Sequence, residues 1–288
     1  IGRMNLAYFA DQRGRILTEM SLLRHDEDHF TLITAAAAQW HDFDVLRPAG
    51  QAGLRLIDHT GDYSTLIVTG PQSRDLFQSL DTQADLYAPW LSHQMARVAA
   101  VDCALARVSF AGELGWEIHA ANKDIPILYA AVIGAGAKPF GMWALNALRM
   151  EKGYRAWKGD LSTDYTVLQG GLDRFVKLDK PQEFPGKAAL LREQQTGPTK
   201  RFVTLVIDAG DQDAPYMSTV SYKGDVVGET TSGDWGYRVN KSIAFAMVRA
   251  DLAQAGTELE VDIFGVPRHA TVQPDAPLWD PENKRLRA

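Results

Sequence analysis

The chain contains little of what several classes of protein require. Its single cysteine, Cys103, permits no internal disulfide and no pair of cysteines for a metal or redox motif, which is typical of an intracellular protein. The longest apolar stretch, residues 128–137, is far shorter than the roughly 20 residues that a membrane-spanning helix needs. No signal-peptide pattern opens the sequence. We therefore expect a cytoplasmic protein with no membrane partner.

The charge balance and the absence of certain sequence motifs argue against several further classes of protein. The 30 basic residues are outnumbered by 36 acidic ones, and a formal net charge of −6 disfavours a surface that binds nucleic-acid phosphates. Gly134 and Gly136 end a helical stretch and lack the third glycine of a dinucleotide loop. Neither a Walker loop nor a GxSxG nucleophile motif is present. His25 and His29 flank an acidic turn, which indicates a solvated hairpin tip and no metal site.

Length and composition indicate a globular protein of about two structural units. At roughly 150 residues per domain, 288 residues correspond to about two domains. A hydrophobic fraction of 45% with 23% charged residues is ordinary for a folded domain. The first residue is Ile1, and the apolar run that begins at Met4 resembles a strand already under way. We therefore expect the sequence to be a piece of a longer protein.

The first two thirds of the chain predict a mixture of strands and helices. Alternating apolar residues between short polar turns favour strands, and apolar residues repeating every three or four positions favour helices. The expected strands are residues 4–10, 16–23, 30–34, 63–68, 96–106, 106–110 and 115–119, and the expected helices are residues 35–47, 71–80, 125–133 and 142–152. This order predicts an α+β fold and not a doubly wound parallel sheet.

The pattern changes near Gly197. Beyond it, short strands alternate with turns rich in Gly, Asp and Asn, and helical spacing is almost absent. The expected strands are residues 202–207, 218–222, 226–229, 243–248 and 258–263. Evenly spaced short strands are typical of a β-barrel or jelly roll. We therefore predict an α+β domain at residues 1–196 and a C-terminal β-barrel domain at residues 197–288.

Three polar residues have ambiguous positions in this pattern. Glu19 alternates with Thr18 and Met20 in a strand, so its carboxylate faces either solvent or a cavity, and the pattern alone favours solvent. Glu117 follows two glycines that allow a ligand to approach the backbone, although an exposed glutamate is the simpler interpretation. Arg149 lies beside the apolar stripe of a helix, which is typical of a surface arginine.

Several short blocks, taken in order, resemble one family. They are Gln12-Arg13-Gly14 with Glu19, Phe110-x-Gly112-Glu113-x-Gly115-x-Glu117-Ile118, Leu148-Arg149-x-Glu151-Lys152-Gly153-Tyr154-Arg155-x-Trp157, Gly170-Gly171-Leu172, Phe175-Val176-Lys177-Leu178, Phe184-x-Gly186-Lys187 and Thr230-Thr231-Ser232-Gly233. Spread over essentially the whole chain, they resemble the folate-binding glycine-cleavage T-protein (aminomethyltransferase) family. Within that family they are most similar to the C-terminal portion of dimethylglycine and sarcosine dehydrogenases.

The resemblance implies a fold and a set of site residues. The fold would be a cloverleaf of α+β subdomains, the first one truncated at its start, followed by a β-barrel, with tetrahydrofolate in a central hole. Glu117 would hold the amino-pyrimidine edge of the pterin, because two parallel N–H donors suit the two oxygens of a carboxylate. Phe110, which stands where many members have a tyrosine, Trp116 and Arg149 would complete the folate contacts. Glu19, where T-proteins carry an aspartate, would be the catalytic carboxylate near the reactive folate nitrogens.

The implied reaction is one-carbon transfer. A small N-methylated amine is oxidised to an iminium at a flavin, and tetrahydrofolate captures the carbon as 5,10-methylene-tetrahydrofolate. Capture requires a nucleophilic nitrogen held close to a cationic carbon, and a nearby carboxylate can stabilise that cation and accept the released proton. Because the chain has no dinucleotide fingerprint, we expect FAD in an oxidase domain or subunit before Ile1. A eukaryotic member would work in the mitochondrial matrix.

Other assignments stay open on the sequence alone. The chain could be a stand-alone aminomethyltransferase or folate-dependent demethylase, or a regulatory subunit that binds folate without turnover. A branch linked to tRNA modification carries a cysteine where this chain has Tyr154, which disfavours that branch. A methyltransferase acting on an O- or S-methyl donor is disfavoured, without being excluded, by the block that contains Glu151 and Trp157. The sequence does not identify the amine.

Overall fold

The chain forms two compact units, neither of which is one continuous stretch of sequence. The computed structural model describes residues 1–51 and 53–288. The first unit comprises Ile1–Ala7, Met20–Gly141 and Glu282–Ala288, and the second comprises Tyr8–Glu19 and Met142–Pro281. The division of the sequence into domains at Gly197 stays a prediction.

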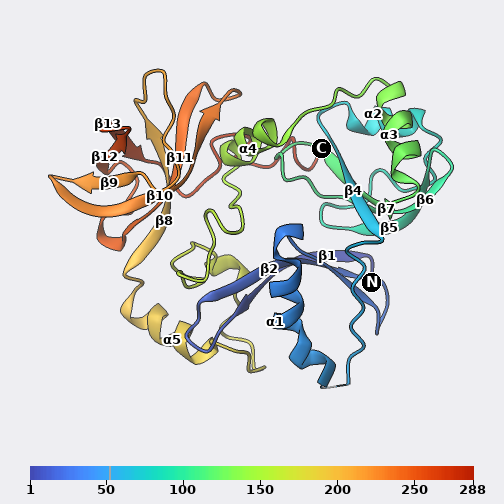
Figure 1. The fold of residues 1–288 in the computed structure, drawn as a ribbon, viewed down its shortest axis with the longest axis horizontal. Helices are drawn as coiled ribbons and strands as arrows, with labels where there is room; N and C mark the ends of the chain where they lie inside the picture. Colours follow the sequence, from blue (N-terminus) through green and yellow to red (C-terminus); the bar gives the residue numbers. More distant parts are fainter. Residues whose placement is uncertain (52) are drawn as a thin grey trace. The chain divides into compact units, whose positions relative to one another are not determined.

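The first unit is built from antiparallel strands and the helices that cover them (Figure 1). Its elements are β3 (Phe30–Ile33), the 3-10 helix η1 (Ala36–Ala38), α1 (Gln39–Gln51), β4 (Tyr63–Thr69), α2 (Ser73–Ser79), β5 (His93–Val98), β6 (Val101–Ala106), β7 (Gly115–Ala121) and α3 (Ile125–Gly134). Strands β1 (Arg3–Ala10) and β2 (Ile16–Arg24) contribute to both units and form a sheet in the order β1-β2-β3. Helix α1 runs through Pro48, beyond the predicted end at residue 47.

The second sheet of the first unit holds β7 in an interior position. Its order is β4-β7-β6-β5, and all neighbours are antiparallel. Alternate residues of β7, including Trp116 and Ile118, pack in a core with Phe77 of α2 and Leu128 of α3. Helices α2 and α3 lie beside this sheet in Figure 1. The opposite face of β7 is therefore the one that can present polar side chains.

Two expected strands differ from the structure. Residues 96–106 form a hairpin instead of one strand, because Ala99 and Ala100 adopt φ angles of 48° and 67° and turn the chain between β5 and β6. The strand expected to continue to residue 110 is a loop that joins β6 to β7. A turn built from two alanines carries none of the usual Gly, Asn or Pro signals, which explains why the pattern missed it.

The second unit contains short helices and the C-terminal strands. Its elements are α4 (Met142–Glu151), η2 (Asp173–Phe175), α5 (Lys187–Thr196), β8 (Lys200–Ile207), β9 (Thr219–Tyr222), β10 (Asp225–Gly236), β11 (Lys241–Arg249), η3 (Ala250–Leu252), β12 (Glu258–Ile263) and β13 (Val266–Val272). The sequence pattern did not predict α5, which is short and largely polar, or β13, which contains a proline. Across the described residues, no helix combines the length and apolarity needed to span a membrane.

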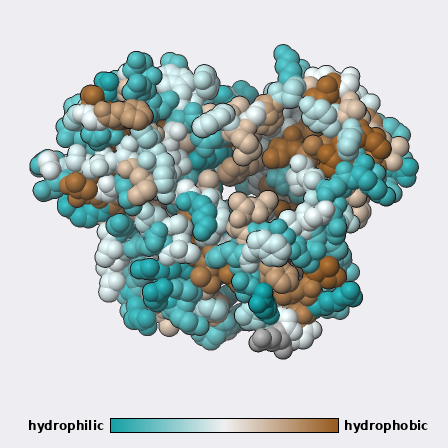
Figure 2. Space-filling view, in the orientation of Figure 1, coloured by the Kyte–Doolittle hydropathy of each residue, from teal (hydrophilic) through white to brown (hydrophobic). Residues whose placement is uncertain are grey.

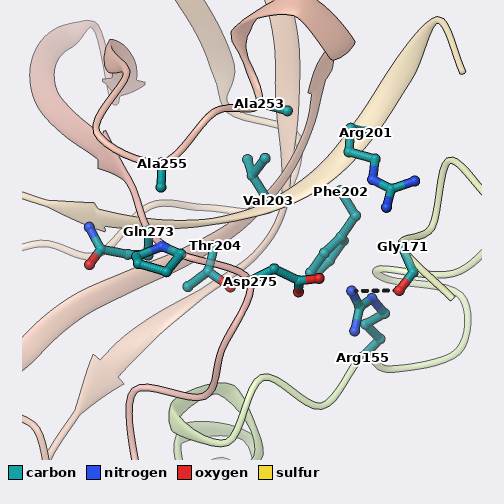
Figure 3. Close-up of a pocket in the computed structure, with 11 residues that line it drawn as sticks. Arg155, Gly171, Arg201, Phe202, Val203, Thr204, Ala253, Ala255, Gln273 and Asp275 are labelled. Atoms are coloured by element: carbon teal, nitrogen blue, oxygen red, sulfur yellow. Dashed lines mark hydrogen bonds between the residues drawn. The ribbon is translucent and has the colours of Figure 1, made fainter. Parts of the chain in front are cut away.

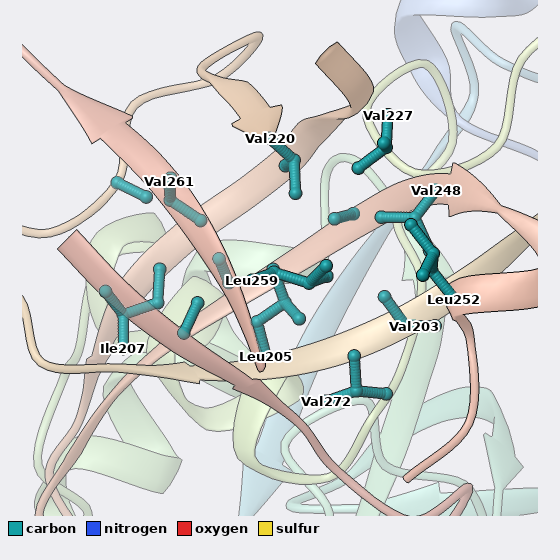
Figure 4. Packing of buried hydrophobic residues seen from close by; sticks show 14 of the residues in the cluster. Val203, Leu205, Ile207, Val220, Val227, Val248, Leu252, Leu259, Val261 and Val272 are labelled. Atoms are coloured by element: carbon teal, nitrogen blue, oxygen red, sulfur yellow. The ribbon is translucent and has the colours of Figure 1, made fainter. Parts of the chain in front are cut away.

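Strands β8 to β13 close into a barrel in the order β10-β11-β8-β13-β12-β9. Its interior is filled by aliphatic side chains such as Leu205, Val220 and Val261, which are fully buried (Figure 4). The surface that Figure 2 shows over the barrel is mostly hydrophilic. The α+β class and the C-terminal barrel predicted from the sequence are thus confirmed.

Strand β11 is buried on both faces and connects the barrel to α4. Ala244 and Ala246 belong to the barrel interior, whereas Phe245 and Met247 pack outside it with Met150 of α4. Full burial of a Phe or Met side chain stabilises by about 1.5–3 kcal/mol. This contact holds the last turn of α4 against the barrel.

Candidate functional site

Glu117 lies on β7, an interior strand of its sheet. Its backbone pairs with Ile67 of β4 on one side and with Ala106 of β6 on the other. The side chain is only 18% exposed, and its Oε2 atom lies 3.3 Å from Nε2 of His119 on the same face. The interpretation of Glu117 as an exposed glutamate is therefore wrong. A carboxylate on a doubly paired strand has a fixed backbone and can still be reached by a ligand.

The two glycines before Glu117 serve the packing of the chain itself. A Cβ on Gly115 would lie 2.9 Å from the carbonyl oxygen of Val68 and 2.9 Å from Oγ1 of Thr69. Gly112 has a φ angle of 72°, a region that favours glycine. The backbone of Val68 and the side chain of Thr69 occupy the space beside Gly115.

Phe110 and Trp116 lie in the same hairpin as Glu117 but differ in exposure. Phe110 is partly buried in the β6–β7 loop, at the end of the hairpin where Ala106 pairs with Glu117. Trp116 is 1% exposed, and its ring meets that of Phe77 edge-on with the centroids 5.1 Å apart. Adjacent strand residues point to opposite faces. Trp116 therefore supports the core beneath Glu117, and this structure gives no support to its predicted contact with a ligand.

Glu19 lies on β2, in the part of the β1–β2 hairpin that belongs to the second unit. It is partly buried, so the solvent-exposed position favoured by the pattern is wrong. Burial raises the pKa of the Glu19 carboxyl, and a hydrogen bond from the Tyr8 hydroxyl and the charge of Arg155 oppose that rise only in part. The result is a carboxyl with a higher proton affinity than a glutamate in water, which suits a proton acceptor.

Tyr8 and Arg155 are neighbours of Glu19 that the sequence pattern did not single out. The Tyr8 ring packs against Phe175 with the centroids 5.4 Å apart, which fixes the hydroxyl beside the carboxyl. Burial lowers the pKa of the Arg155 guanidinium, whose central carbon lies 4.0 Å from the ring centroid of Phe202. The expected hairpin places Tyr8 on the strand beside that of Glu19, which is the one signal that could have found it. No local signal could have found Arg155.

Arg149 is buried near the end of α4, and each of its N–H donors has an acceptor. Nε and Nη2 donate to Oδ1 of Asn146 at 3.0 and 2.7 Å. Nη1 donates to the Tyr154 carbonyl at 3.0 Å and to Oδ2 of Asp160 at 2.5 Å, and Nη2 donates to Oγ of Ser232 at 2.7 Å. A guanidinium has five N–H groups. Arg149 is thus not a surface residue, and the predicted folate contact finds no free donor on it.

Asp160 is the buried counter-charge of Arg149 and joins the loop after α4 to the barrel. Its Oδ1 atom accepts hydrogen bonds from the hydroxyls of Thr231 and Ser232 at 2.6 and 2.8 Å. Both hydroxyls come from β10, which explains the Thr-Thr-Ser-Gly block of that strand. Gly233 ends the block because a Cβ there would overlap the carbonyl of Ala214. The network is structural and links residues that are more than 70 positions apart.

Three histidines form a cluster in the first unit. His25 stacks on His29 with the ring centroids 4.6 Å apart, and His93 meets His25 edge-on at 4.8 Å. The ring of His93 is hydrogen-bonded through Nε2 to the Arg24 carbonyl at 2.9 Å. Within residues 1–51 and 53–288, no group of three or more His, Cys, Asp or Glu residues is arranged to hold a metal ion. The cluster therefore packs the turn between β2 and β3 against the start of β5, and it is a site of pH sensitivity.

Acidification is expected to destabilise the first unit through this cluster. Burial lowers the pKa of His25, and His93 and His29 add to the effect. Burial also lowers the pKa of His93, against the opposing hydrogen bond to Arg24. A base whose pKa is depressed by folding stays neutral in the folded chain, while the unfolded chain takes up protons below the usual histidine value of 6.5. This contribution to stability is complete above that pH and is lost as the pH falls.

The measurement is the free energy of unfolding between pH 7.5 and pH 5. We expect the fall in stability on acidification to be smaller in His93→Gln than in the parent. The matched control is His269→Gln, at an exposed position of the barrel outside the cluster. An identical pH slope in the parent and in His93→Gln would show that the cluster does not couple protonation to folding.

Family models and curated relatives agree on one family. The model described as the GCVT N-terminal domain matches residues 1–180, and the one described as the glycine cleavage T-protein C-terminal barrel domain matches residues 200–280. Mitochondrial dimethylglycine dehydrogenase from Rattus norvegicus is 34% identical over 297 residues, which cover 100% of this chain and 35% of that protein. An aminomethyltransferase from Symbiobacterium thermophilum is 30% identical over 297 residues, covering 99% of this chain and 78% of that protein.

A solved structure of an aminomethyltransferase has the same fold as this chain. The crystal structure of the glycine cleavage system aminomethyltransferase T from Bartonella henselae matches with a TM-score of 0.89 and 23% identity, over 98% of this chain and 77% of that one. The T-protein fold implied by the sequence blocks is thus confirmed. The chain spans about a third of the dehydrogenase relative and about three quarters of the aminomethyltransferase. With family models matching most of its length, the chain belongs to the glycine cleavage T-protein family.

Proposed function

We propose that this chain is the tetrahydrofolate-binding, one-carbon-transfer domain of an FAD-dependent demethylase of the dimethylglycine or sarcosine type. The observation that carries the proposal is the carboxylate of Glu117, which an interior strand holds within reach of a ligand at the position that family resemblance assigns to the pterin. FAD and the oxidation of the amine belong, on this proposal, to a domain or subunit outside residues 1–288. The dehydrogenase relative is described as mitochondrial, and a eukaryotic member would share that location.

In this proposal Glu117 acts in binding. Its two oxygens accept the parallel N–H donors of the amino-pyrimidine edge, and such charge-assisted pairs are stronger than neutral ones. Phe110, in the adjacent loop, contributes ring contact without the hydroxyl of a tyrosine. On this proposal Trp116 packs in the core under its sheet and Arg149 serves the hydrogen-bond network of the second unit, so neither is assigned a contact with the ligand.

Glu19 acts where charge changes. A folate N–H nitrogen attacks the iminium carbon, and its proton passes to the amine nitrogen. The amine leaves with the electron pair of its C–N bond and with that proton, and the second folate N–H nitrogen closes the ring and releases its own proton. The Glu19 carboxylate stabilises the cationic carbon and accepts that proton. Tyr8 orients the carboxylate through its hydroxyl, and the raised pKa of Glu19 makes it a better base than an exposed glutamate.

Replacing Glu117 by glutamine is expected to weaken tetrahydrofolate binding by about ten- to a hundredfold, because a charge-assisted pair is worth roughly 1.5–3 kcal/mol. The substitution keeps the side-chain volume and removes the charge. A calorimetric titration of tetrahydrofolate measures the change, with Glu260→Gln, an exposed barrel position, as the matched control. Equal affinity in Glu117→Gln and the parent would remove Glu117 from the site.

A second candidate is a stand-alone aminomethyltransferase. The bacterial aminomethyltransferase is matched over 78% of its length, far more than the dehydrogenase. The two candidates differ in the source of the one-carbon unit. Formation of methylene-tetrahydrofolate from an aminomethyl donor, with no flavin present, would favour the stand-alone enzyme. Dependence on an oxidase portion and an N-methylated amine would favour the demethylase domain.

A further inference from the structure

The second unit contains a cavity of about 250 Å³ that none of the residues proposed for folate line (Figure 3). Its walls come from the start of β8, the turn after η3, the segment after β13 and the loop that follows α4. The side chains that decide its chemistry are Arg155, Phe202, Gln273 and Asp275. At about 30 Å³ per water molecule, the volume equals about eight waters. The cavity therefore has room for a small organic molecule.

Arg155 brings a poorly satisfied positive charge to this cavity. Its Nε atom is buried without a hydrogen-bond partner among the described residues. Its two Nη atoms donate to the carbonyls of Gly153 and Gly171 at 3.5 and 3.4 Å, which are long contacts. In the described part of the chain, no carboxylate lies within 4 Å of this guanidinium. The ring of Phe202 stacks against it and offsets only part of its lost hydration.

Asp275 brings a negative charge to the same cavity. It is exposed at the rim, and among the described residues no cation lies within 4 Å of its carboxylate. The other arginine of the cavity, Arg201, is already paired, because its Nη2 atom lies 2.9 Å from Oδ2 of Asp173. Among the described residues of this cavity, Arg155 is thus a cation and Asp275 an anion without an ion-pair partner, and the two charges lie too far apart to pair with each other.

We propose that this cavity binds a small amino-acid zwitterion, with its carboxylate on Arg155 and its ammonium group towards Asp275. A carboxylate matches the planar fork of a guanidinium and would accept shorter hydrogen bonds from the Nη donors, whose present contacts with backbone carbonyls are long. The ammonium group at the rim stays partly hydrated beside Asp275. Phe202, Ala253 and Ala255 provide an apolar wall for a side chain or for N-substituents. This inference does not depend on folate binding or on one-carbon transfer.

Three matched probes separate the two charges of the ligand. L-Alanine carries both groups, propionate carries only the carboxylate, and ethylamine carries only the ammonium group. Titrated into the whole chain and followed by ligand-observed NMR, alanine is expected to bind more tightly than propionate, and ethylamine is expected not to saturate. The absence of saturable alanine binding, or propionate binding as tightly as alanine, would overturn the proposal.

Two substitutions test the residue assignments. Arg155→Gln is expected to weaken both alanine and propionate by about ten- to a hundredfold. Asp275→Asn is expected to weaken alanine by about two- to fivefold, as for an exposed pair, and to leave propionate unchanged. Arg192→Gln, on the exposed side of α5, is the matched control and should change neither affinity.

The Asp275→Asn variant keeps the proposal testable if Arg155→Gln fails to fold. Its side chain is exposed and makes no ion pair within the described residues, so the variant should fold even if Arg155→Gln does not. Alanine affinity that is unchanged in Asp275→Asn would contradict the zwitterion, whatever happens to the arginine variant. Alanine binding that is about two- to fivefold weaker, with unchanged propionate binding, in Asp275→Asn would support it.

Discussion

Glu19→Ala is expected to slow capture of the one-carbon unit by about 10²- to 10⁴-fold, the usual value of general acid–base help, while tetrahydrofolate affinity stays close to that of the parent. The reason is that Glu19 is proposed to act on groups whose charge changes during the reaction, the cationic carbon and the nitrogen that loses a proton. An interaction made mainly in the transition state affects rate more than binding. Its partly buried position and raised pKa fit that role better than they fit a surface residue.

The measurement follows three quantities in parallel in the intact protein that includes the amine-oxidising portion. These are the amine consumed, the methylene-tetrahydrofolate formed and the free formaldehyde released. In Glu19→Ala, oxidation should continue and formaldehyde should accumulate at the expense of methylene-tetrahydrofolate. Glu260→Ala is the matched control at an exposed glutamate. An equal yield and rate of methylene-tetrahydrofolate in Glu19→Ala and the parent would end the catalytic assignment of Glu19.

Asp160→Ala is expected to destabilise the second unit by about 3–5 kcal/mol, the usual cost of removing one partner of a buried ion pair. The substitution leaves Arg149 buried, at 3% exposure, without its counter-charge. It also removes the acceptor of the Thr231 and Ser232 hydroxyls. The variant would therefore lack the carboxylate that connects the loop after α4 to strand β10.

Denaturant unfolding followed by tryptophan fluorescence measures this effect as a shift of the midpoint. Asp208→Ala, at an exposed position of the same unit, is the matched control and should stay within about 0.5 kcal/mol of the parent. A loss of less than about 1 kcal/mol in Asp160→Ala would show that the Arg149 network contributes little to the fold.

The features that sequence reasoning predicted are those with a local cause. Evenly spaced apolar runs predict the barrel strands. The alternation of polar Glu117 with apolar Trp116 and Ile118 predicts the strand that holds it. The same alternation shows that Trp116 and Glu117 cannot share a face. The predicted folate contact of Trp116 came from its place in the resembling block and not from that geometry.

The features that it missed depend on contacts between distant segments. Whether Glu19 is exposed is decided by what packs against its hairpin, including Arg155, which lies 136 positions further along the chain. Arg149 is buried because Asp160 and Ser232 meet it from a loop and from a barrel strand. Apolar periodicity along one helix contains no information about partners from distant segments. An arginine beside an apolar stripe is therefore predicted to be a surface residue, whatever it contacts in the fold.

The central claim is that this chain both binds tetrahydrofolate and accelerates capture of a one-carbon unit. A stopped-flow measurement of 5,10-methylene-tetrahydrofolate formation from formaldehyde and tetrahydrofolate, with and without the chain, tests it most directly. We predict a saturable acceleration over the uncatalysed reaction that Glu19→Ala abolishes and Glu260→Ala retains. A rate equal to the uncatalysed one at saturating tetrahydrofolate would contradict the claim and would leave a folate-binding module without chemistry.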